Sequence, residues 1–208
     1  MQIDIRDSRV RLEHLTMLKE NEHGRFSSLN WGTNLGYPRA TVFINGGDKS
    51  VRGFDNIIVA PFNFYSFGLL TQAFEEIITS PADTNINIEC YNNKFENGKR
   101  LDELELQTTV TVGKNKSGRI FIAFKSGEKP PVAFAIKPQK KWHRYIVNGV
   151  DKTDDPEGCA VFAKAYFNNV VRSVNSLGEK MATYEKVRGG DTSKDDAKQS
   201  TDNEFELF

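Results

Sequence analysis

The chain has 208 residues, enough to bury a core in one large domain or two small ones. Its 28 basic and 28 acidic residues cancel, which excludes a strongly basic, histone-like protein. No run of about 18 apolar residues occurs, so we expect no membrane span.

The N-terminal residues and the spacing of the cysteines predict the cellular compartment. The first six residues do not form the apolar stretch of a secretory signal. Cys90 and Cys159 lie far apart in the sequence and outside any metal-ligand spacing, which argues against a disulfide framework. We therefore expect a cytoplasmic protein, located in the host cytoplasm if it comes from a phage.

The first half is predicted to end in an amphipathic helix. The pattern is weak up to Thr33, and β-branched and aromatic residues then predict strands at residues 39–45 and 56–60. The period changes to that of a helix over residues 63–80, with Asn63 as a suitable N-cap and Ser80-Pro81 as the stop. The apolar stripe of this helix is Phe67, Leu70, Phe74, Ile77 and Ile78.

The second half repeats this order of strands followed by a helix. The predicted strands cover residues 85–91, 104–112, 119–125, 132–137 and 142–147. A helix then begins near Pro156, after Asp154 or Asp155 as N-cap, and Gly178 is the expected stop. Beyond about Tyr184 the composition is too polar to bury a core.

A faint internal repeat supports this division. Residues 39–49 can be laid over residues 119–129 without gaps, with matching Arg, Gly, acidic and Lys positions. We therefore expect an α+β domain over residues 1–184, with repeat halves at 1–81 and 82–184. Residues 185–208 are predicted to form a disordered acidic tail.

The zero net charge conceals an asymmetry between body and tail. Residues 189–208 carry a net charge of −4, and the remaining chain carries +4. A basic body attracts polyanions, and an acidic tail competes for the same surface.

No enzyme motif is present. The chain lacks a Walker phosphate loop, a G-x-S-x-G elbow and an H-E-x-x-H helix, and its three histidines are scattered. Adjacent acids such as Glu75-Glu76 do not form a two-metal site by themselves. We expect no catalysis, no metal and no cofactor. One alternative stays open, a nuclease whose acidic residues are distant in the sequence and meet in the fold.

Strand alternation indicates a surface suited to nucleic acid. In residues 119–125, Ile120, Ile122 and Phe124 share the core face, which leaves cations and an aromatic ring on the other face. Residues 39–45 show the same pattern. Cations neutralise phosphates, and rings stack on bases of any sequence. The alternative is that these rings pack under a helix or against another subunit.

Further aromatic and basic residues cluster around these strands. Together the clusters give the predicted nucleic-acid-binding residues, which are Trp31, Tyr37, Arg39, Phe43, Tyr91, Lys94, Lys116, Arg119, Phe121, Lys125, Lys140, Lys141, Trp142 and Arg144. The stretch from Lys140 to Arg144 is the densest of them.

The last seven residues alternate acids with large apolar groups, which is typical of a docking peptide on a flexible tether. They resemble the acidic, Phe-terminated tails of phage and bacterial single-stranded DNA-binding proteins. That resemblance covers about a tenth of the chain, and the Pro-Phe ending of the bacterial family is absent. It implies that the tail recruits replication and repair enzymes and shields the DNA-binding surface. The matching positions are Asp202, Glu204, Phe205, Glu206 and Phe208.

The order of elements resembles the Whirly-like fold, a duplicated unit of curled antiparallel sheets and helices that binds single strands. The K-G-K-A-A-L motif of that family is absent, so no binding residue is carried over, and an elaborated OB-fold is the alternative fold.

We expect a sequence-independent single-stranded DNA-binding protein of replication, recombination or repair, without membrane contact. Two alternatives are an RNA-binding or transcription-regulating protein and a viral structural or assembly protein. The sequence leaves open whether the chain forms a homo-oligomer.

Overall fold

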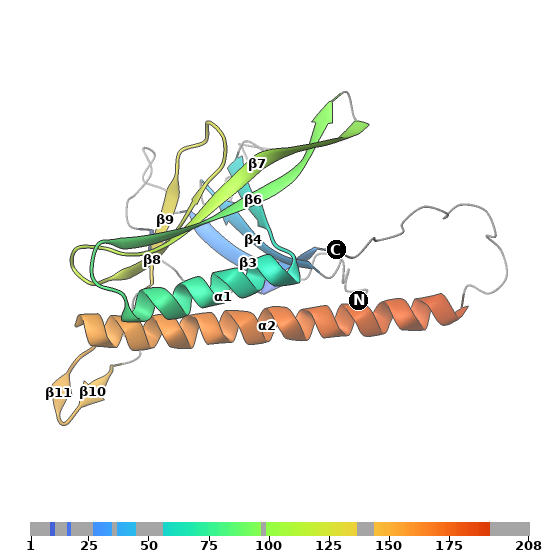
Figure 1. The fold of residues 1–208 in the computed structure, drawn as a ribbon. Helices are drawn as coiled ribbons and strands as arrows, with labels where there is room; N and C mark the ends of the chain where they lie inside the picture. The colour runs from blue at the N-terminus through green and yellow to red at the C-terminus, as the bar shows by residue number, and fades with distance from the viewer. Residues whose placement is uncertain are drawn as a thin grey trace.

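The computed structural model describes residues 9–10, 16–17, 27–34, 37–44, 56–96, 99–136 and 144–191. It is an α+β fold with two helices and three antiparallel sheets (Figure 1), as the sequence predicts. Sequence reasoning found most of the elements, because burial of one face imposes a regular period on each of them.

The first sheet has the strand order β1-β3-β4-β5. These strands are β1 (Arg9–Val10), β3 (Ser28–Asn34), β4 (Tyr37–Phe43) and β5 (Ile57–Pro61). Strands β4 and β5 match the predicted ones. Strand β3 lies in the stretch whose pattern is weak, and it pairs along its whole length with β4, from Ser28 opposite Phe43 to Asn34 opposite Tyr37.

The second sheet is larger and has the order β2-β9-β8-β7-β6. Its strands are β2 (Thr16–Met17), β6 (Thr84–Glu96), β7 (Lys99–Lys114), β8 (Ile120–Lys125) and β9 (Val132–Ala135). A small hairpin of β10 (Ile146–Val147) and β11 (Val150–Asp151) forms the third sheet. Of the strand predicted over residues 142–147, the described residues Arg144 and Tyr145 are not strand, and only Ile146–Val147 are.

Helix α1 (Phe64–Thr79) begins and ends where the sequence predicts. The Asn63 side chain accepts from the backbone N–H of Ser66 at 2.7 Å, and the Ser66 hydroxyl accepts from the backbone N–H of Asn63 at 2.9 Å. This reciprocal capping box satisfies two backbone donors that the first helical turn would otherwise leave unpaired. The predicted stripe is confirmed by the burial of Phe67, Leu70, Phe74 and Ile77.

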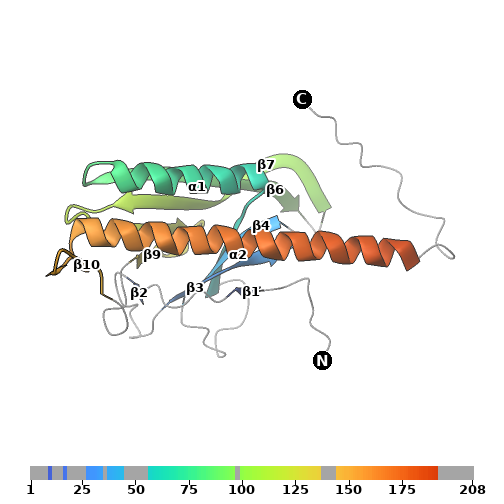
Figure 2. The ribbon, with the colours of Figure 1, turned by 90° about the horizontal axis from the view of Figure 1, so that it is seen from below.

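Helix α2 (Pro156–Asp191) is longer than predicted. It begins at Pro156 as expected, but it continues through Gly178 and past Tyr184, where the sequence predicts a stop and then a disordered tail. A single glycine in a helix costs only about 1 kcal/mol relative to alanine, which the neighbouring turns can offset. In both ribbon views the helix runs beside α1 and then extends beyond the body (Figures 1 and 2).

Trp31 of β3 lies at the centre of the core. It is 0% exposed, and its ring is within about 6.5 Å of four phenylalanine rings. These rings are Phe62 after β5, Phe67 of α1, Phe124 of β8 and Phe167 of α2. Since they come from both large sheets and both helices, Trp31 joins all the main layers of the fold.

Hydrogen bonds also hold the two large sheets together. The Thr108 hydroxyl of β7 donates to the Val59 carbonyl of β5 at 2.7 Å, and the Lys129 ammonium donates to the Ile57 carbonyl at 2.7 Å. Strand β2 belongs to the first predicted half but pairs with β9 of the second. The two predicted repeat halves therefore share a sheet.

Strands β6 and β7 form a hairpin whose far end projects from the body as an arm (Figure 1), here defined as residues 91–96 and 99–106. The register shifts between Cys90 and Tyr91, where one step along β6 matches two along β7. Alternation in the sequence predicts Leu104 and Leu106 on the buried face, but both are exposed. The extra residue interrupts the alternation, and the arm has no layer to pack against.

Replacement of two glycines by alanine should change the free energy of unfolding in opposite directions. A Cβ at Gly158 in the first turn of α2 would overlap the backbone carbonyl oxygen of Lys152, whereas a Cβ at exposed Gly68 in α1 has nothing within 4 Å. We expect Gly158→Ala to lower the free energy of unfolding by about 3 kcal/mol through overpacking. Gly68→Ala should raise it by about 0.5–1 kcal/mol, because alanine is the better helix former. Urea unfolding measures both, and equal effects would contradict the packing described at Gly158.

Within the part of the chain that the structure describes, neither helix has a segment long and apolar enough to cross a membrane.

Candidate nucleic-acid interface

A cleft of about 620 Å³ lies where β4, β5, the start of α1 and the hairpin β6–β7 meet. Phe62 donates its backbone N–H to the Pro38 carbonyl at 2.9 Å, which holds the end of β5 beside the start of β4. Binding sites for small ligands commonly have this volume. The residues that line the cleft are Tyr37, Pro38, Arg39, Val59, Pro61, Phe62, Asn63, Ser66, Glu89, Cys90, Tyr91, Asn92 and Gln107.

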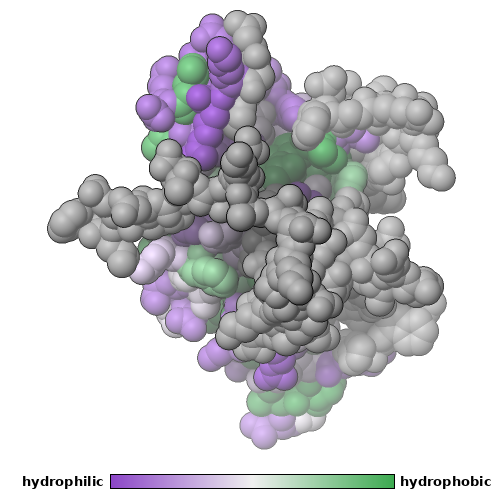
Figure 3. Space-filling view, turned by 90° about the vertical axis from the view of Figure 1, so that its right-hand side faces the viewer, coloured by the Kyte–Doolittle hydropathy of each residue, from purple (hydrophilic) through white to green (hydrophobic). Residues whose placement is uncertain are grey.

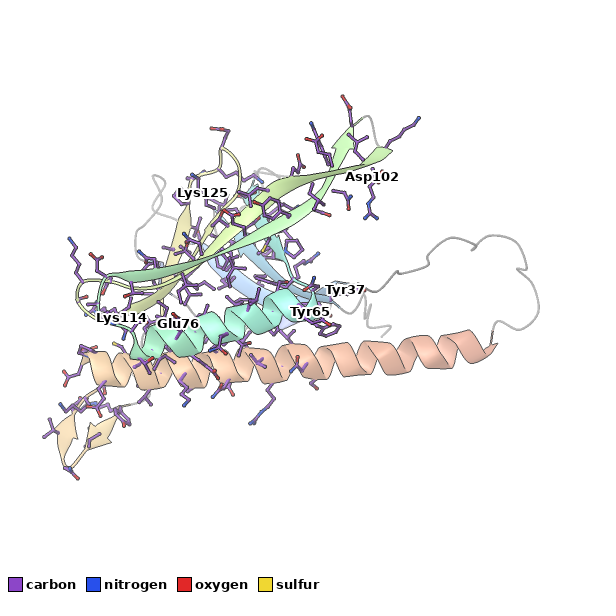
Figure 4. All side chains as sticks on the ribbon, in the orientation of Figure 1. Tyr37, Tyr65, Glu76, Asp102, Lys114 and Lys125 are labelled. Atoms are coloured by element: carbon purple, nitrogen blue, oxygen red, sulfur yellow. The ribbon has the colours of Figure 1, made fainter. Side chains whose placement is uncertain are left out.

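Exposed aromatic rings gather at this cleft. Tyr37 and Tyr91 line it and are each 52% exposed. Phe64, 62% exposed, lies 6.1 Å from Tyr37 between ring centroids, and Tyr65 beside it is 86% exposed. Figure 4 shows Tyr37 and Tyr65 together at one end of α1. We call these four residues and the cleft the aromatic cleft.

Figure 3 views this end of the molecule and shows hydrophobic surface in the hollow beneath the hydrophilic arm. Large rings are not normally left exposed in a group, and such a patch is typical of an interaction surface. Tyrosine suits a binding surface because it offers a wide face with few rotatable bonds. The arrangement can therefore hold a flat, unsaturated ligand by stacking.

Sequence reasoning placed Tyr37 and Tyr91 at the interface but missed Phe64 and Tyr65. Both follow Asn63, the predicted N-cap, and both lie outside the apolar stripe that begins at Phe67. Aromatic residues off the buried stripe of an amphipathic helix must face solvent or a partner. That position was the signal from which they could have been found.

The surroundings of Tyr91 and Cys90 on β6 raise the pKa of both side chains and keep them uncharged. The Tyr91 hydroxyl donates to a Glu89 carboxylate oxygen at 2.7 Å, and this hydrogen bond together with the Glu89 charge raises the pKa of Tyr91. Tyr91 is therefore a neutral ring at physiological pH. Burial raises the pKa of the Cys90 thiol to about 11, so this lining residue is protonated and unreactive.

The electrostatics of the aromatic cleft are mixed. Arg39 is the basic residue and Glu89 the acidic residue among the described residues that line it. Asn63 and Ser66 at the N-terminus of α1 also line the cleft, and the first turn of this helix has no acidic residue. A phosphate near Arg39 and this helix end would be stabilised, because partial and full positive charges face it together.

Gln107 has an unsatisfied acceptor at the wall of the cleft. Its main-chain carbonyl accepts from the Ser126 hydroxyl at 2.7 Å, while its side-chain Oε1 is buried without a hydrogen-bond partner. It is the only such buried side-chain atom among the described residues. A buried acceptor without a donor is unfavourable by about 1–3 kcal/mol, so the group is poised to accept a hydrogen bond.

The predicted cations are dispersed instead of forming one groove. Lys94 lies on the arm, where Glu103 approaches it at 3.7 Å. The arm carries three basic residues and four acidic ones, so it is not a basic surface. In this arm, residues 91–93 pair with residues 104–106, and residues 95–96 pair with residues 99–100. Sequence neighbours that appear basic are thus diluted by acids from the opposite strand.

Strand β8 carries a second set of predicted residues. Arg119, just before the strand, and Lys125, at its end, are exposed, and Phe121 between them is half-buried. The two cations are separated by six residues of extended chain, or about 20 Å. An added Cβ at Gly113 would collide with the Phe121 ring, so this ring lies over the neighbouring strand and offers a base less surface than Tyr37 does.

The remaining predicted cations lie at the far end of the molecule from the aromatic cleft. Lys116 is exposed in the turn between β7 and β8, and the neighbouring Lys114 donates to the carbonyls of Ile78 and Ser80 at the end of α1. Figure 4 shows Lys114 at the opposite end of α1 from Tyr37. Arg144 is exposed just before the small hairpin. These residues are not brought together with the rings.

Trp31 is a correction to the predicted interface. It is fully buried, and its indole N–H donates to the Tyr166 hydroxyl at 2.7 Å, so it cannot stack on a base.

Among the other predicted residues, Phe43 is half-buried at the end of β4. Lys140, Lys141 and Trp142 lie outside the described residues, as do Asp202, Glu204, Phe205, Glu206 and Phe208 of the tail.

The described residues contain no group of three or more His, Cys, Asp or Glu side chains that could hold a metal ion.

The chain matches no protein-family model, no curated protein and no solved structure.

Proposed function

We propose that the protein binds single-stranded DNA without a required sequence and acts in replication, recombination or repair. The observation that carries the proposal is the aromatic cleft, where exposed Tyr37 and Tyr91 line the same hollow as Arg39, and exposed Phe64 and Tyr65 lie at the start of α1. Stacking of a base on an aromatic ring contributes about 1–3 kcal/mol and works for every base. Arg39 and the helix end supply the complementary attraction for the phosphate.

Single strands fit this cleft better than a duplex does. The rings can reach the face of a base only if the base is unstacked from its neighbours. The described cations are also too dispersed for an extended backbone track of the kind that duplex binding by charge requires. The proposal therefore gives the rings the larger part of the affinity and the charges the smaller part.

The direct test is filter binding of labelled oligo-dT to the full chain at low salt. We expect saturable binding that weakens as salt is raised, because Arg and Lys release counterions from the phosphates. Unlabelled single-stranded DNA, RNA and duplex DNA are then used as competitors. Better competition by RNA would favour the RNA-binding alternative, and absence of binding would contradict the proposal.

The acidic tail is proposed to regulate the same surface and to recruit partner enzymes. It carries the alternating acids and aromatic residues that end at Phe208. Its negative charge makes it a competitor for cations that hold DNA, and Phe205 and Phe208 suit apolar pockets of partner proteins.

Truncation after Thr201 should tighten DNA binding by about two- to tenfold at low salt, because it removes an intramolecular polyanion. Anisotropy of labelled oligo-dT measures the change for the full and shortened chains. As a control, Phe205→Ala with Phe208→Ala keeps the acids and should leave binding closer to that of the full chain. Unchanged or weaker binding after truncation would contradict competition by the tail.

A further inference from the structure

The chemistry of the aromatic cleft points to a preference among bases, in addition to stacking. Three of its lining residues have a side-chain acceptor oxygen that already has a donor. Asn63 Oδ1 accepts from the Ser66 backbone at 2.7 Å, and Glu89 accepts from Tyr91 at 2.7 Å. Asn92 Oδ1 likewise accepts from a backbone N–H, that of Asn93, at 2.9 Å. Gln107 Oε1 is the lining acceptor that is buried and has none.

Gln107 is also held in place for such a role. It lies on β7 opposite the register shift at Cys90 and Tyr91, where the hairpin leaves the body. The Ser126 hydroxyl fixes its main-chain carbonyl, and the next residue, Thr108, is buried and bonded to Val59 of β5. The backbone is thus anchored at Gln107 and Thr108, where the Gln107 side chain lines the cleft.

We infer that the aromatic cleft selects a base that carries an exocyclic amino group, which donates to Oε1 of Gln107. This inference rests on the proposed function and specifies which base the site holds best. Cytosine presents an amino donor at N4 and adenine one at N6, whereas thymine presents an acceptor, O4, at the corresponding position. With Oε1 directed at the base, the same stacked pose gives this oxygen a donor with cytosine or adenine and places it against another acceptor with thymine.

The preference is modest in size. Stacking on Tyr37 and Tyr91 is available to every base, so thymine still binds. The additional hydrogen bond at one position should favour the amino-bearing base by about tenfold, the usual effect of satisfying a single buried acceptor. The protein thus needs no particular sequence, but it binds cytosine- and adenine-containing strands more tightly than thymine-only strands.

The test compares oligo-dT with an oligonucleotide of equal length, about 12 nucleotides, made of 5-methyldeoxycytidine. The two bases have the same ring and the same methyl group, and they differ at position 4, where an amino group replaces the oxygen, and in the protonation of N3. Dissociation constants are measured for the full chain by anisotropy at one salt concentration. We expect the 5-methyldeoxycytidine strand to bind about tenfold more tightly.

Gln107→Met removes the acceptor and keeps a side chain of similar length. It should abolish the difference between the two strands by weakening the 5-methyldeoxycytidine complex. The matched control is Leu106→Met, one residue away on the same strand and exposed, which should keep the full preference. Tryptophan emission, to which Trp31 in the core contributes, reports whether each variant is folded.

Three outcomes separate the inference from the proposed function. Tighter binding of the 5-methyldeoxycytidine strand that disappears in Gln107→Met supports both. Equal binding of the two strands, tighter binding of oligo-dT, or a preference that survives Gln107→Met overturns the inference and leaves single-strand binding standing. Absence of binding to either strand overturns the proposed function, and the inference with it.

Discussion

Replacing Tyr37 and Tyr91 together by alanine should weaken oligo-dT binding by at least about thirtyfold. Each ring contributes about 1–3 kcal/mol if a base stacks on it, and the two contributions combine at one cleft. Both residues are about half exposed, so their removal opens no cavity in the core. The loss should therefore appear in the dissociation constant while the free energy of unfolding stays nearly constant.

Two matched variants identify the cause of this loss. Tyr37→Phe with Tyr91→Phe keeps both rings and removes the hydrogen bond to Glu89, and it should bind like the natural protein. Ile146→Ala with Val150→Ala removes exposed apolar surface from the small β10–β11 hairpin and should also bind normally. Weak binding by the phenylalanine pair would show that hydroxyl contacts, not stacking, hold the ligand. Full binding by the alanine pair would show that the ligand lies elsewhere.

Trp31→Ala should lower the free energy of unfolding by about 3–5 kcal/mol and can prevent folding altogether. The substitution leaves a cavity between two sheets and two helices, because the Trp31 ring contacts phenylalanines from each of them. Domains are typically stable by about 5–15 kcal/mol, so such a loss is a large fraction of the total. Urea or thermal unfolding of purified protein measures it.

Tyr166→Phe tests the role of Trp31 in the core with a smaller change to the packing. It removes only the oxygen that accepts from the Trp31 indole, and the unpaired N–H should reduce the free energy of unfolding by about 1–3 kcal/mol. DNA binding by this folded variant should be unchanged, because Trp31 belongs to the core. A folded, normally stable Tyr166→Phe protein that has lost DNA binding would instead place Trp31 in the interface.

Much of the fold could be predicted because burial imposes a period on the sequence. Strand β8 shows this plainly: Ile120, Ile122 and Phe124 are buried and alternate with half-buried or exposed residues, as predicted. The α1 cap at Asn63 was equally readable, since capping depends on residues adjacent in sequence. Local signals of this kind do not need knowledge of the tertiary structure.

The errors come from tertiary effects. Leu104 and Leu106 fit an alternating pattern, but the register shift and the absence of a covering layer leave them exposed. Trp31 was taken for a surface ring because the strand that holds it has a weak pattern. Its burial depends on four phenylalanines that are distant in sequence, so no local feature indicated it.

The sequence predicted some residues of the interface but not how the fold groups them. Tyr37, Arg39 and Tyr91 were predicted separately, and the fold brings them to one cleft, although more than 50 residues separate Tyr37 from Tyr91. Lys94, Lys116 and Arg119 were equally good candidates by composition, but none of them lines the cleft. Composition identifies residues that are able to bind nucleic acid, while the topology decides which of them can act together.

Photo-crosslinking tests most directly whether bases stack in the aromatic cleft. An oligonucleotide carrying 5-iododeoxyuridine is bound to the full chain, irradiated, and the crosslinked peptides are identified by mass spectrometry. We predict adducts on Tyr37, Phe64, Tyr65 or Tyr91, which disappear when unlabelled oligo-dT is added in excess. Specific adducts confined to Phe121 or to the exposed hairpin at Ile146, with none at the cleft, would contradict the account.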